Sequence, residues 1–249
     1  MKTMAKGLPH IQRLFAAVLG LAMLHPTAVL AQTDTSAPQS ASATPSLSQQ
    51  DWSFWPDEQD QAPQTTHSGS SRNPDCNSHG SMPLTPHAQI GRTSQQRPDL
   101  LLYVSSAVPH QAIFAIQSVN NFYHAVPITL PEATGIVRIP LPPEIPDLAD
   151  NEQYRWSLVF LCHDELSPDS PVLSRWLETQ VSTHESELPM QPSIEQAAQY
   201  RDDALWYDMI AMLAQLKSGH PEDDTVQQAW LSVLSRQRLE NLADEPILP

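Results

Sequence analysis

The stretch Tyr154-Arg155-Trp156-Ser157-Leu158-Val159-Phe160-Leu161-Cys162 is the best candidate for a central strand of this protein. Alternate side chains of an extended strand point to opposite faces. One face of this strand then carries only core-type residues, namely Tyr154, Trp156, Leu158, Phe160 and Cys162. The stretch therefore predicts a half-buried strand that serves as a structural hub and not as an active site.

The first 31 residues have the features of a secretory signal peptide. Three basic residues, Lys2, Lys6 and Arg13, precede an uncharged apolar run over residues 14–24. After this run, Val29-Leu30-Ala31 suits cleavage before Gln32. An apolar run of about eleven residues is short for a membrane span, which needs roughly 20. We expect an exported protein, periplasmic or extracellular, without a membrane span once the signal is removed. The alternative is an uncleaved N-terminal anchor.

The rest of the chain is strongly acidic. Without residues 1–31, 10 Lys and Arg stand against 28 Asp and Glu, which gives a formal net charge of −18. Such a surface repels phosphate backbones and anionic lipid head groups. We therefore expect no nucleic-acid partner, and expect the partner to be an unidentified protein of the cell envelope.

The chain has two cysteines, Cys76 and Cys162. Oxidising compartments preserve disulfides, so an exported chain with two cysteines favours a bridge between them. The bridge would close a loop of roughly 86 residues, worth about 4–5 kcal/mol in the chain-entropy model. We predict this disulfide; the alternative is two free thiols.

Residues 32–95 predict a disordered linker, because Ser, Thr, Gln, Pro and Ala dominate residues 32–50. Three aromatic residues, Trp52, Phe54 and Trp55, interrupt this composition. They form either a docking motif for a partner or a satellite cluster that folds back onto the parent domain.

Residues 96–183 carry the patterns of β-strands. Apolar or alternating segments occur at residues 99–105, 112–119, 124–130, 135–141, 154–162 and 172–181. Short turns and no helices separate them, which favours an antiparallel β-sandwich of immunoglobulin-like kind. Pro127 cannot donate to a strand ladder, so its strand is expected at a sheet edge or at a bulge.

Residues 190–249 predict helices. Polar residues that suit helix starts are Ser193 with Gln196 as a capping box, Asp202 or Asp203, and Asp223 or Asp224. Gly219 and Pro221 end the second helix. The last two helices form an αα-hairpin, without a second copy that would indicate a helical repeat. The expected fold class is thus α+β: a disordered N-terminal tail, a sandwich and a C-terminal helical hairpin.

The order and spacing of several short motifs resemble a family of exported, mostly cyanobacterial proteins catalogued as domain of unknown function number 928. The resemblance runs from Cys76 to the C-terminus. It rests on Leu84-Thr85-Pro86, Arg97-Pro98, Gly135-Ile136-Val137, Leu141-Pro142, Tyr154-Arg155-Trp156, Leu161-Cys162, Leu205-Trp206-Tyr207-Asp208, Ala229-Trp230, Leu239-Glu240 and Glu245-Pro246-Ile247. The chain departs from the family pattern over residues 86–96 and at Ala204. The resemblance implies no activity, ligand or catalytic residue, because the family has none established.

Few residue groups could bind a metal. Cys76 and His79, with His67 and His87 nearby, supply one close pair of ligands where zinc usually takes two pairs. The segment His163-Asp164-Glu165 is either a cation site or, as we expect, a solvated turn. We predict no metal and no cofactor.

Catalytic patterns are also scarce. Seven glycines, two of them in the signal, form no phosphate-binding loop and no nucleophile elbow. Trp156, Trp176, Trp206 and Trp230 lie in apolar segments and are expected in the core, not on a carbohydrate platform. We therefore predict no catalytic residue and favour a non-catalytic protein-binding or assembly module of the envelope. The alternatives are a hydrolase or lyase of unrecognised type that uses Asp208 with Glu178 or His163, and a secreted stress or surface structural protein.

Overall fold

Eight β-strands are present in the part of the chain that the structure describes. The computed structural model describes residues 51–52, 80–87, 89–181 and 191–249, all within one compact unit, Thr44–Pro249. The strands are β1 (Ser81–Pro83), β2 (Gly91–Thr93), β3 (Asp99–Val104), β4 (Gln111–Ser118), β5 (Tyr123–Thr129), β6 (Gly135–Pro140), β7 (Gln153–Phe160) and β8 (Val172–Thr179). The six strands predicted from the sequence correspond to β3–β8.

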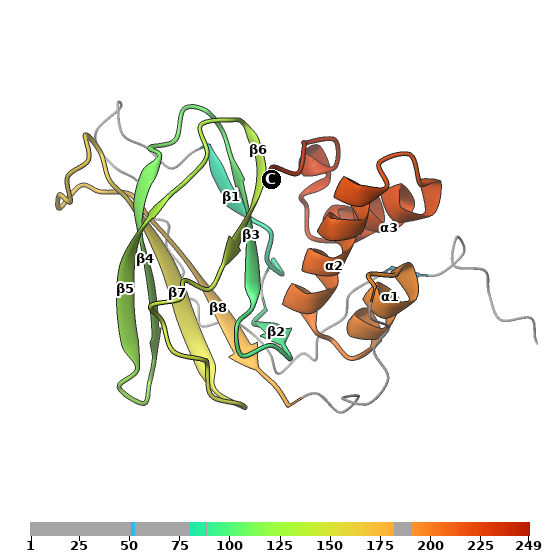
Figure 1. The fold of residues 1–249 in the computed structure, drawn as a ribbon, viewed down its shortest axis with the longest axis horizontal. Coiled ribbons are helices and arrows are strands. Elements are labelled where there is room, and N and C mark those ends of the chain that lie inside the picture. Colours follow the sequence, from blue (N-terminus) through green and yellow to red (C-terminus); the bar gives the residue numbers. More distant parts are fainter. Residues whose placement is uncertain (1–50, 53–79, 88, 182–190) are drawn as a thin grey trace, which may run out of the picture. The chain divides into compact units, whose positions relative to one another are not determined.

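The strands form two sheets. The first has the order β1-β3-β6 and the second has the order β2-β8-β7-β4-β5 (Figure 1). Every pair is antiparallel except β2–β8, which is parallel. The prediction of a purely antiparallel arrangement was therefore wrong at this edge. The chain passes from β1 in the three-stranded sheet to β2 in the five-stranded sheet, and β2 runs in the same direction as its neighbour β8.

The central strand of the five-stranded sheet is β7, as the sequence predicted. Tyr154, Trp156, Leu158 and Phe160 are all at most 1 % exposed. Cys162 lies beyond the end of the strand, in an isolated bridge to Glu165. The strand is thus shorter at this end than predicted, because the chain turns at His163 and Asp164, both with positive φ.

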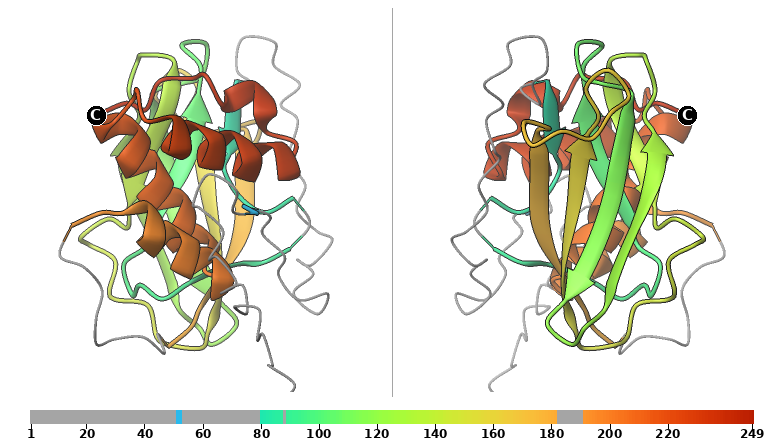
Figure 2. Two further views of the ribbon diagram at one scale, coloured as in Figure 1. Left: turned by 90° about the vertical axis from the view of Figure 1, so that its right-hand side faces the viewer. Right: turned by 90° about the vertical axis from the view of Figure 1, so that its left-hand side faces the viewer.

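The three-stranded sheet lies between the five-stranded sheet and the helices (Figures 1 and 2). Consecutive residues of β3, Leu100, Leu101 and Leu102, are all buried, so both faces of this strand are covered. In contrast, β4 and β7 bury only every second side chain. Because β3 is covered by the five-stranded sheet on one face and by the helices on the other, the strands and the helices share one hydrophobic core.

Two strands lie inside the range predicted as linker. Residues 80–95 contain β1 and β2, so this end of the predicted linker was wrong. Each strand has three residues, and neither Ser81-Met82-Pro83 nor Gly91-Arg92-Thr93 has an apolar alternation. They are held by backbone pairing with β3 and β8, which a sequence pattern does not record.

Three α-helices follow the sheets: α1 (Ile194–Asp202), α2 (Trp206–Gly219) and α3 (Asp224–Arg236), with a short 3₁₀ helix η2 (Glu240–Leu242). Ser193 caps α1 by accepting from the Gln196 amide, and Asp223 caps α3, as predicted. The predicted Asp202 or Asp203 cap of α2 was wrong. Leu205 stands at that N-cap position without a side-chain hydrogen bond, because Ala204 with positive φ turns the chain after α1.

The C-terminal residues return to the sheet. Ile136 of β6 forms a parallel bridge with Ile247, through hydrogen bonds to the Pro246 carbonyl and from the Leu248 amide. Gly135 makes this approach possible, since a Cβ there would lie 2.7 Å from the Pro246 carbonyl oxygen. The C-terminal segment thus covers the outer edge of β6.

Candidate functional site

Asp208 lies in the first turn of α2, where this helix packs on β2 and β3. Its carboxylate is buried and accepts two hydrogen bonds from Ser94, from the amide at 3.0 Å and from the hydroxyl at 2.8 Å. A carboxylate at this helix end is also favoured by the helix dipole. Asp208 therefore ties the helices to the segment that joins β2 to β3.

A polar cavity of about 190 Å³ adjoins Asp208 and is lined also by Asp99, Arg138, Tyr200 and Tyr207. Burial raises the pKa of the Asp208 carboxyl above 3.8, and the hydrogen bonds from Ser94 partly oppose the rise. Burial likewise raises the pKa of Asp99, against the opposing charge of Arg138 at 3.6 Å. The cavity thus holds two desolvated carboxyls.

The two residues predicted from the sequence as catalytic partners of Asp208, Glu178 and His163, do not line the cavity beside it. Glu178 is on β8, where it pairs with Arg92 at 3.8 Å and accepts from Gln153, and it does not line the cavity. His163 follows β7, at the end of the sheet where β8 begins. Six residues of β8 separate that end from Glu178, which is about 20 Å of strand. Asp208, Glu178 and His163 therefore form no catalytic group.

Tyr207, the neighbour of Asp208, joins α2 to the five-stranded sheet. Its hydroxyl accepts from the Trp156 indole N–H at 3.1 Å and donates to the Trp176 carbonyl at 2.9 Å. Burial raises the pKa of Tyr207, so the hydroxyl stays a neutral donor and acceptor. Gly91 lets β2 approach the ring, since a Cβ there would lie 2.7 Å from it.

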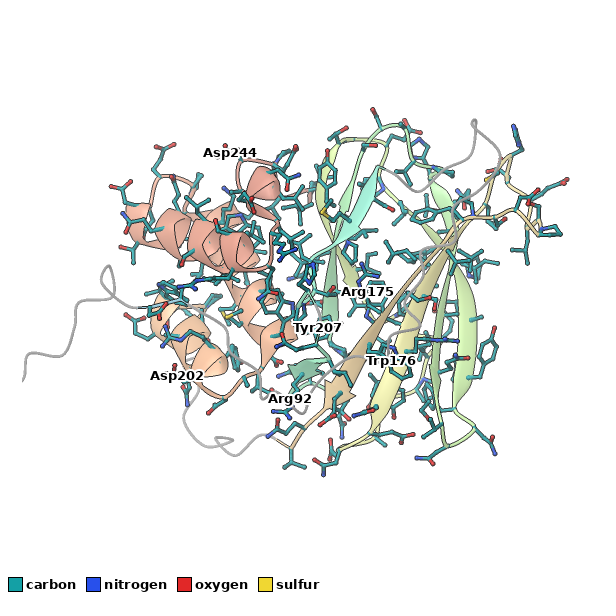
Figure 3. All side chains as sticks on the ribbon, turned by 180° about the vertical axis from the view of Figure 1, so that it is seen from behind. Arg92, Arg175, Trp176, Asp202, Tyr207 and Asp244 are labelled. Carbon is teal, nitrogen blue, oxygen red and sulfur yellow. The ribbon has the colours of Figure 1, made fainter. Side chains whose placement is uncertain are left out.

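Arg175 of β8 lies beside Tyr207 at this junction (Figure 3). Its guanidinium donates to the Thr85 hydroxyl and to the Ser174 carbonyl, and no ion pair joins it to a described carboxylate. Burial lowers its pKa, and the neighbouring Tyr207 opposes that effect. We assign Arg175 to the structural junction, because its Nε and Nη1 donors bind groups of the fold.

The outer face of the five-stranded sheet, which points away from the helices, carries three rows of side chains across β5, β4, β7 and β8. The first row is apolar: Pro127, Ile113, Val159 and Val172. The middle row, which we name the trough, has only small residues: Ala125, Ala115, Ser157 and Ser174. The third row has larger, mostly polar residues: Tyr123, Gln117, Arg155 and Trp176. No described element covers this face.

The family model described as Domain of Unknown Function (DUF928) matches residues 67–247 of the chain. The chain belongs to the DUF928 family. The family resemblance predicted from the sequence is thereby confirmed, and the family carries no assigned function. Comparison with curated proteins and with solved structures gives no match.

The structure of this DUF928 protein explains why the family's motifs are spread along the chain. The Trp206 indole N–H donates to the Leu84 carbonyl at 2.9 Å, and the Trp156 indole donates to Tyr207. Motifs more than 100 residues apart in sequence thus meet at the junction of α2 with the two sheets. These two contacts contribute to the packing of α2 on the sheets.

The predicted docking residues are only partly described. Trp52 is 4 % exposed, and the Arg201 guanidinium lies 5.2 Å from its ring centroid. Arg201 also donates to the Asp51 carbonyl. Trp52 thus follows the fold-back alternative and is not accessible to a partner, whereas Phe54 and Trp55 lie outside the described residues.

Other predicted features also lie outside the described residues. These are the signal peptide 1–31 and the residues Cys76, His67 and His79, so the Cys76–Cys162 disulfide stays a prediction. Among the described residues, no group of three or more His, Cys, Asp or Glu side chains could hold a metal ion. No helix in the described part is long and apolar enough to span a membrane.

Sequence reasoning did not find the trough or the partners of Asp208. The alternation of each strand was visible in the sequence, but which residues face each other across strands depends on register. Ser94 lies 114 positions from Asp208, and no local signal connects the two.

Proposed function

We propose that this DUF928 protein is an exported, non-catalytic module that binds another protein of the cell envelope through the outer face of its five-stranded sheet. The observation that carries the proposal is the trough between two rows of larger side chains, on the side opposite the helices, where no element of the described residues covers the sheet. Asp208, the strongest catalytic candidate, is held by Ser94, and neither of the partners predicted for it, Glu178 and His163, lines its cavity, which disfavours a hydrolase or lyase that uses these residues.

The dimensions of the trough suit a helix. Successive side chains on one face of a strand are about 6.6–6.8 Å apart, so the two flanking rows are about 13 Å apart. An α-helix with its side chains is about 10–12 Å wide. We infer that the partner lays a helix into the trough, with its apolar side chains on Ile113, Val159 and Val172.

The sheets support a finer fold assignment, an immunoglobulin-like sandwich. In such domains one sheet contains the first, second and fifth strands. These correspond here to β1, β3 and β6, which form one sheet, when β2 is left out of the count. In addition, a tyrosine near the start of the penultimate strand forms a hydrogen bond with the backbone a few residues upstream. Here the Tyr154 hydroxyl, at the start of β7, accepts from the Ala149 amide at 2.9 Å. Trp156 stands two residues later, where antibody domains have a cysteine, and stacks on Phe114 with centroids 6.5 Å apart. Both rings belong to the five-stranded sheet, so they pack side by side within one sheet where antibody domains have a bridge between sheets.

The test is photo-cross-linking in the native envelope. A photoreactive amino acid at Ala115 or Ser174 should capture the same protein, while the same group at Ser235, exposed on α3, should not. Ala115→Arg fills the trough and should abolish capture from Ser174 without a change in circular dichroism. Gln153→Arg, outside the three rows, is the matched control. Equal capture from all positions, or none from the trough, would contradict the proposal.

The secreted structural alternative makes a different prediction for the same experiment. If this face joined copies of the chain into a surface layer, the product captured from Ala115 would be a dimer of the protein itself. Capture of a different envelope protein would distinguish the binding module from this alternative.

A further inference from the structure

Trp52 is part of the hydrophobic core although it lies outside the family domain. The family model begins at residue 67. The Trp52 side chain is nevertheless 4 % exposed and belongs to the same core as the strands and the helices. A buried tryptophan covers about 150–250 Å² of surface. The family domain thus provides a site for an indole, and the residue that fills it comes from outside the domain.

Arg201, in the last turn of α1, contacts two parts of the segment Asp51-Trp52. Its guanidinium lies 5.2 Å from the centroid of the Trp52 ring, and its Nη1 donates to the Asp51 carbonyl at 2.6 Å. A cation over the face of an indole is attracted by the ring quadrupole, more strongly when the pair is desolvated. The Arg201 side chain is 9 % exposed, so most of its surface is desolvated.

Asp202 holds the guanidinium of Arg201 in place for these contacts. Its carboxylate accepts from Nε at 2.9 Å and from Nη2 at 2.6 Å, while Nη1 binds the Asp51 carbonyl. A preorganised side chain loses less conformational entropy when it binds. The features that Arg201 recognises are an indole face and the carbonyl of the preceding residue, which every peptide with an internal tryptophan offers.

We propose that α1 carries a peptide-binding site for a tryptophan and the residue before it, and that Asp51-Trp52 is its tethered ligand. Because this ligand belongs to the same chain, its binding does not cost the translational and rotational freedom of a second molecule. A free peptide of the same sequence therefore binds well only when Trp52 is absent. The proposal is independent of the outer face of the five-stranded sheet.

The experiment adds a peptide of residues 47–53 to the mature protein with Trp52→Ala and follows the backbone amides of α1 by NMR. Trp52 is the only aromatic residue of this peptide. The peptide should shift the amides around Arg201 in a saturable manner. It should bind the wild-type protein at least tenfold more weakly, because Trp52 already fills the site. A peptide with Trp52→Ala should also bind the variant at least tenfold more weakly.

Two arginine variants test the recognition. In the Trp52→Ala protein, Arg201→Gln should weaken binding of the peptide at least tenfold, because it removes both the cation over the ring and the donor to the carbonyl. Arg236→Gln is the matched control, since Arg236 is the basic residue in the last turn of α3 and is exposed. This change should leave the affinity for the peptide unchanged.

A second experiment keeps Trp52 in place while the chain folds, so its result does not depend on the stability of the Trp52→Ala protein. A protease recognition sequence replaces residues 58–63 of the mature protein, ahead of the family domain, and is cleaved after folding. The cleaved segment should stay bound and exchange with a fluorescent copy of residues 32–57. A fluorescent copy with Trp52→Ala should not exchange.

Four results would overturn the proposal. The first is no saturable shift in folded Trp52→Ala protein at millimolar peptide, and the second is loss of the cleaved segment without rebinding. The third is equal affinity of the peptide for the wild type and for the Trp52→Ala protein, which would show that it binds elsewhere. The fourth is an affinity that does not change with Arg201→Gln or with removal of the tryptophan from the peptide.

Discussion

Tyr207 shows how one side chain connects layers of the fold. Its hydroxyl is both acceptor and donor, between an indole of β7 and a carbonyl of β8, while its backbone belongs to α2. Because the site is fully buried, no water can replace either bond without a rearrangement of the packing.

Removal of this hydroxyl should therefore be costly. We expect Tyr207→Phe to lower the free energy of unfolding by about 1–3 kcal/mol, because the Trp156 indole and the Trp176 carbonyl both lose their partner. Urea unfolding of the mature protein measures the change. Tyr123→Phe, at a tyrosine that is 63 % exposed, should be close to neutral, and an equal loss in both variants would contradict the role of the buried bonds.

Asp208 makes stability depend on pH in a defined direction. Burial raises the pKa of its carboxyl above 3.8 in the folded protein, so the folded state binds more protons than the unfolded state in that range. This contribution is complete below the unfolded pKa and is lost as pH rises through the folded pKa. Relative to Asp208→Asn, the wild type should thus lose stability as pH increases from about 4. Unfolding curves of both proteins across this range test it, and a constant difference would refute it.

At the scale of the elements, the β6 edge depends on a glycine. Gly135 has φ of +156°, and an added Cβ would meet the Pro246 carbonyl and the Leu248 side chain. An uncovered edge strand would otherwise expose unpaired backbone groups. The C-terminal segment can cover this edge only because position 135 has no side chain.

We expect Gly135→Ala to lower the free energy of unfolding by about 1–3 kcal/mol, since it combines backbone strain with displacement of the C-terminal segment. In a chain that ends at Glu245 the same substitution should cost less, because the contact with Pro246 and Leu248 is gone. Thermal unfolding of the four proteins gives the coupling. Gly219→Ala, with no atom within 4 Å of the added Cβ, should be neutral or slightly stabilising.

At the scale of the whole molecule, the strands and helices are not separable parts. Residues of β3 bury both faces, one against the five-stranded sheet and one against the helices, and the hydrophobic core includes residues from Trp52 to Ala243. A chain that ends at Val181 should therefore fail to fold. We expect it to be insoluble or to bind hydrophobic dyes, as judged by gel filtration and dye fluorescence; a soluble, cooperatively unfolding fragment would contradict the shared core.

The predicted Cys76–Cys162 disulfide would join the N-terminal segment to the end of β7. Oxidised, denatured mature protein should contain no thiol that reacts with an alkylating reagent, and reduction should release two. Reduction should also lower the melting temperature, because the loop closed by the bridge is long. Two reactive thiols before reduction would rule the bridge out.

The sequence by itself determined the elements that can be recognised from residues close together along the chain. Alternation of apolar residues located β3–β8 to within a few residues, and side chains that bind nearby amides located the caps at Ser193 and Asp223. It also indicated the family, because the spacing of motifs is a property of the chain. These features are readable since each depends on residues close together in sequence.

Only the tertiary structure decided what those elements do together. The strands β1 and β2 form by pairing with β3 and β8, which are distant in sequence. The structure assigns Asp208 a structural role, because Ser94 from the segment between β2 and β3 donates two hydrogen bonds to its carboxylate. The trough depends on the register of four strands, and the Trp52 site depends on the contact of Arg201 with a segment 150 positions before it. Each of these is a long-range contact, whose formation rests on burial and hydrogen bonding across the fold and leaves no periodic signal along the chain.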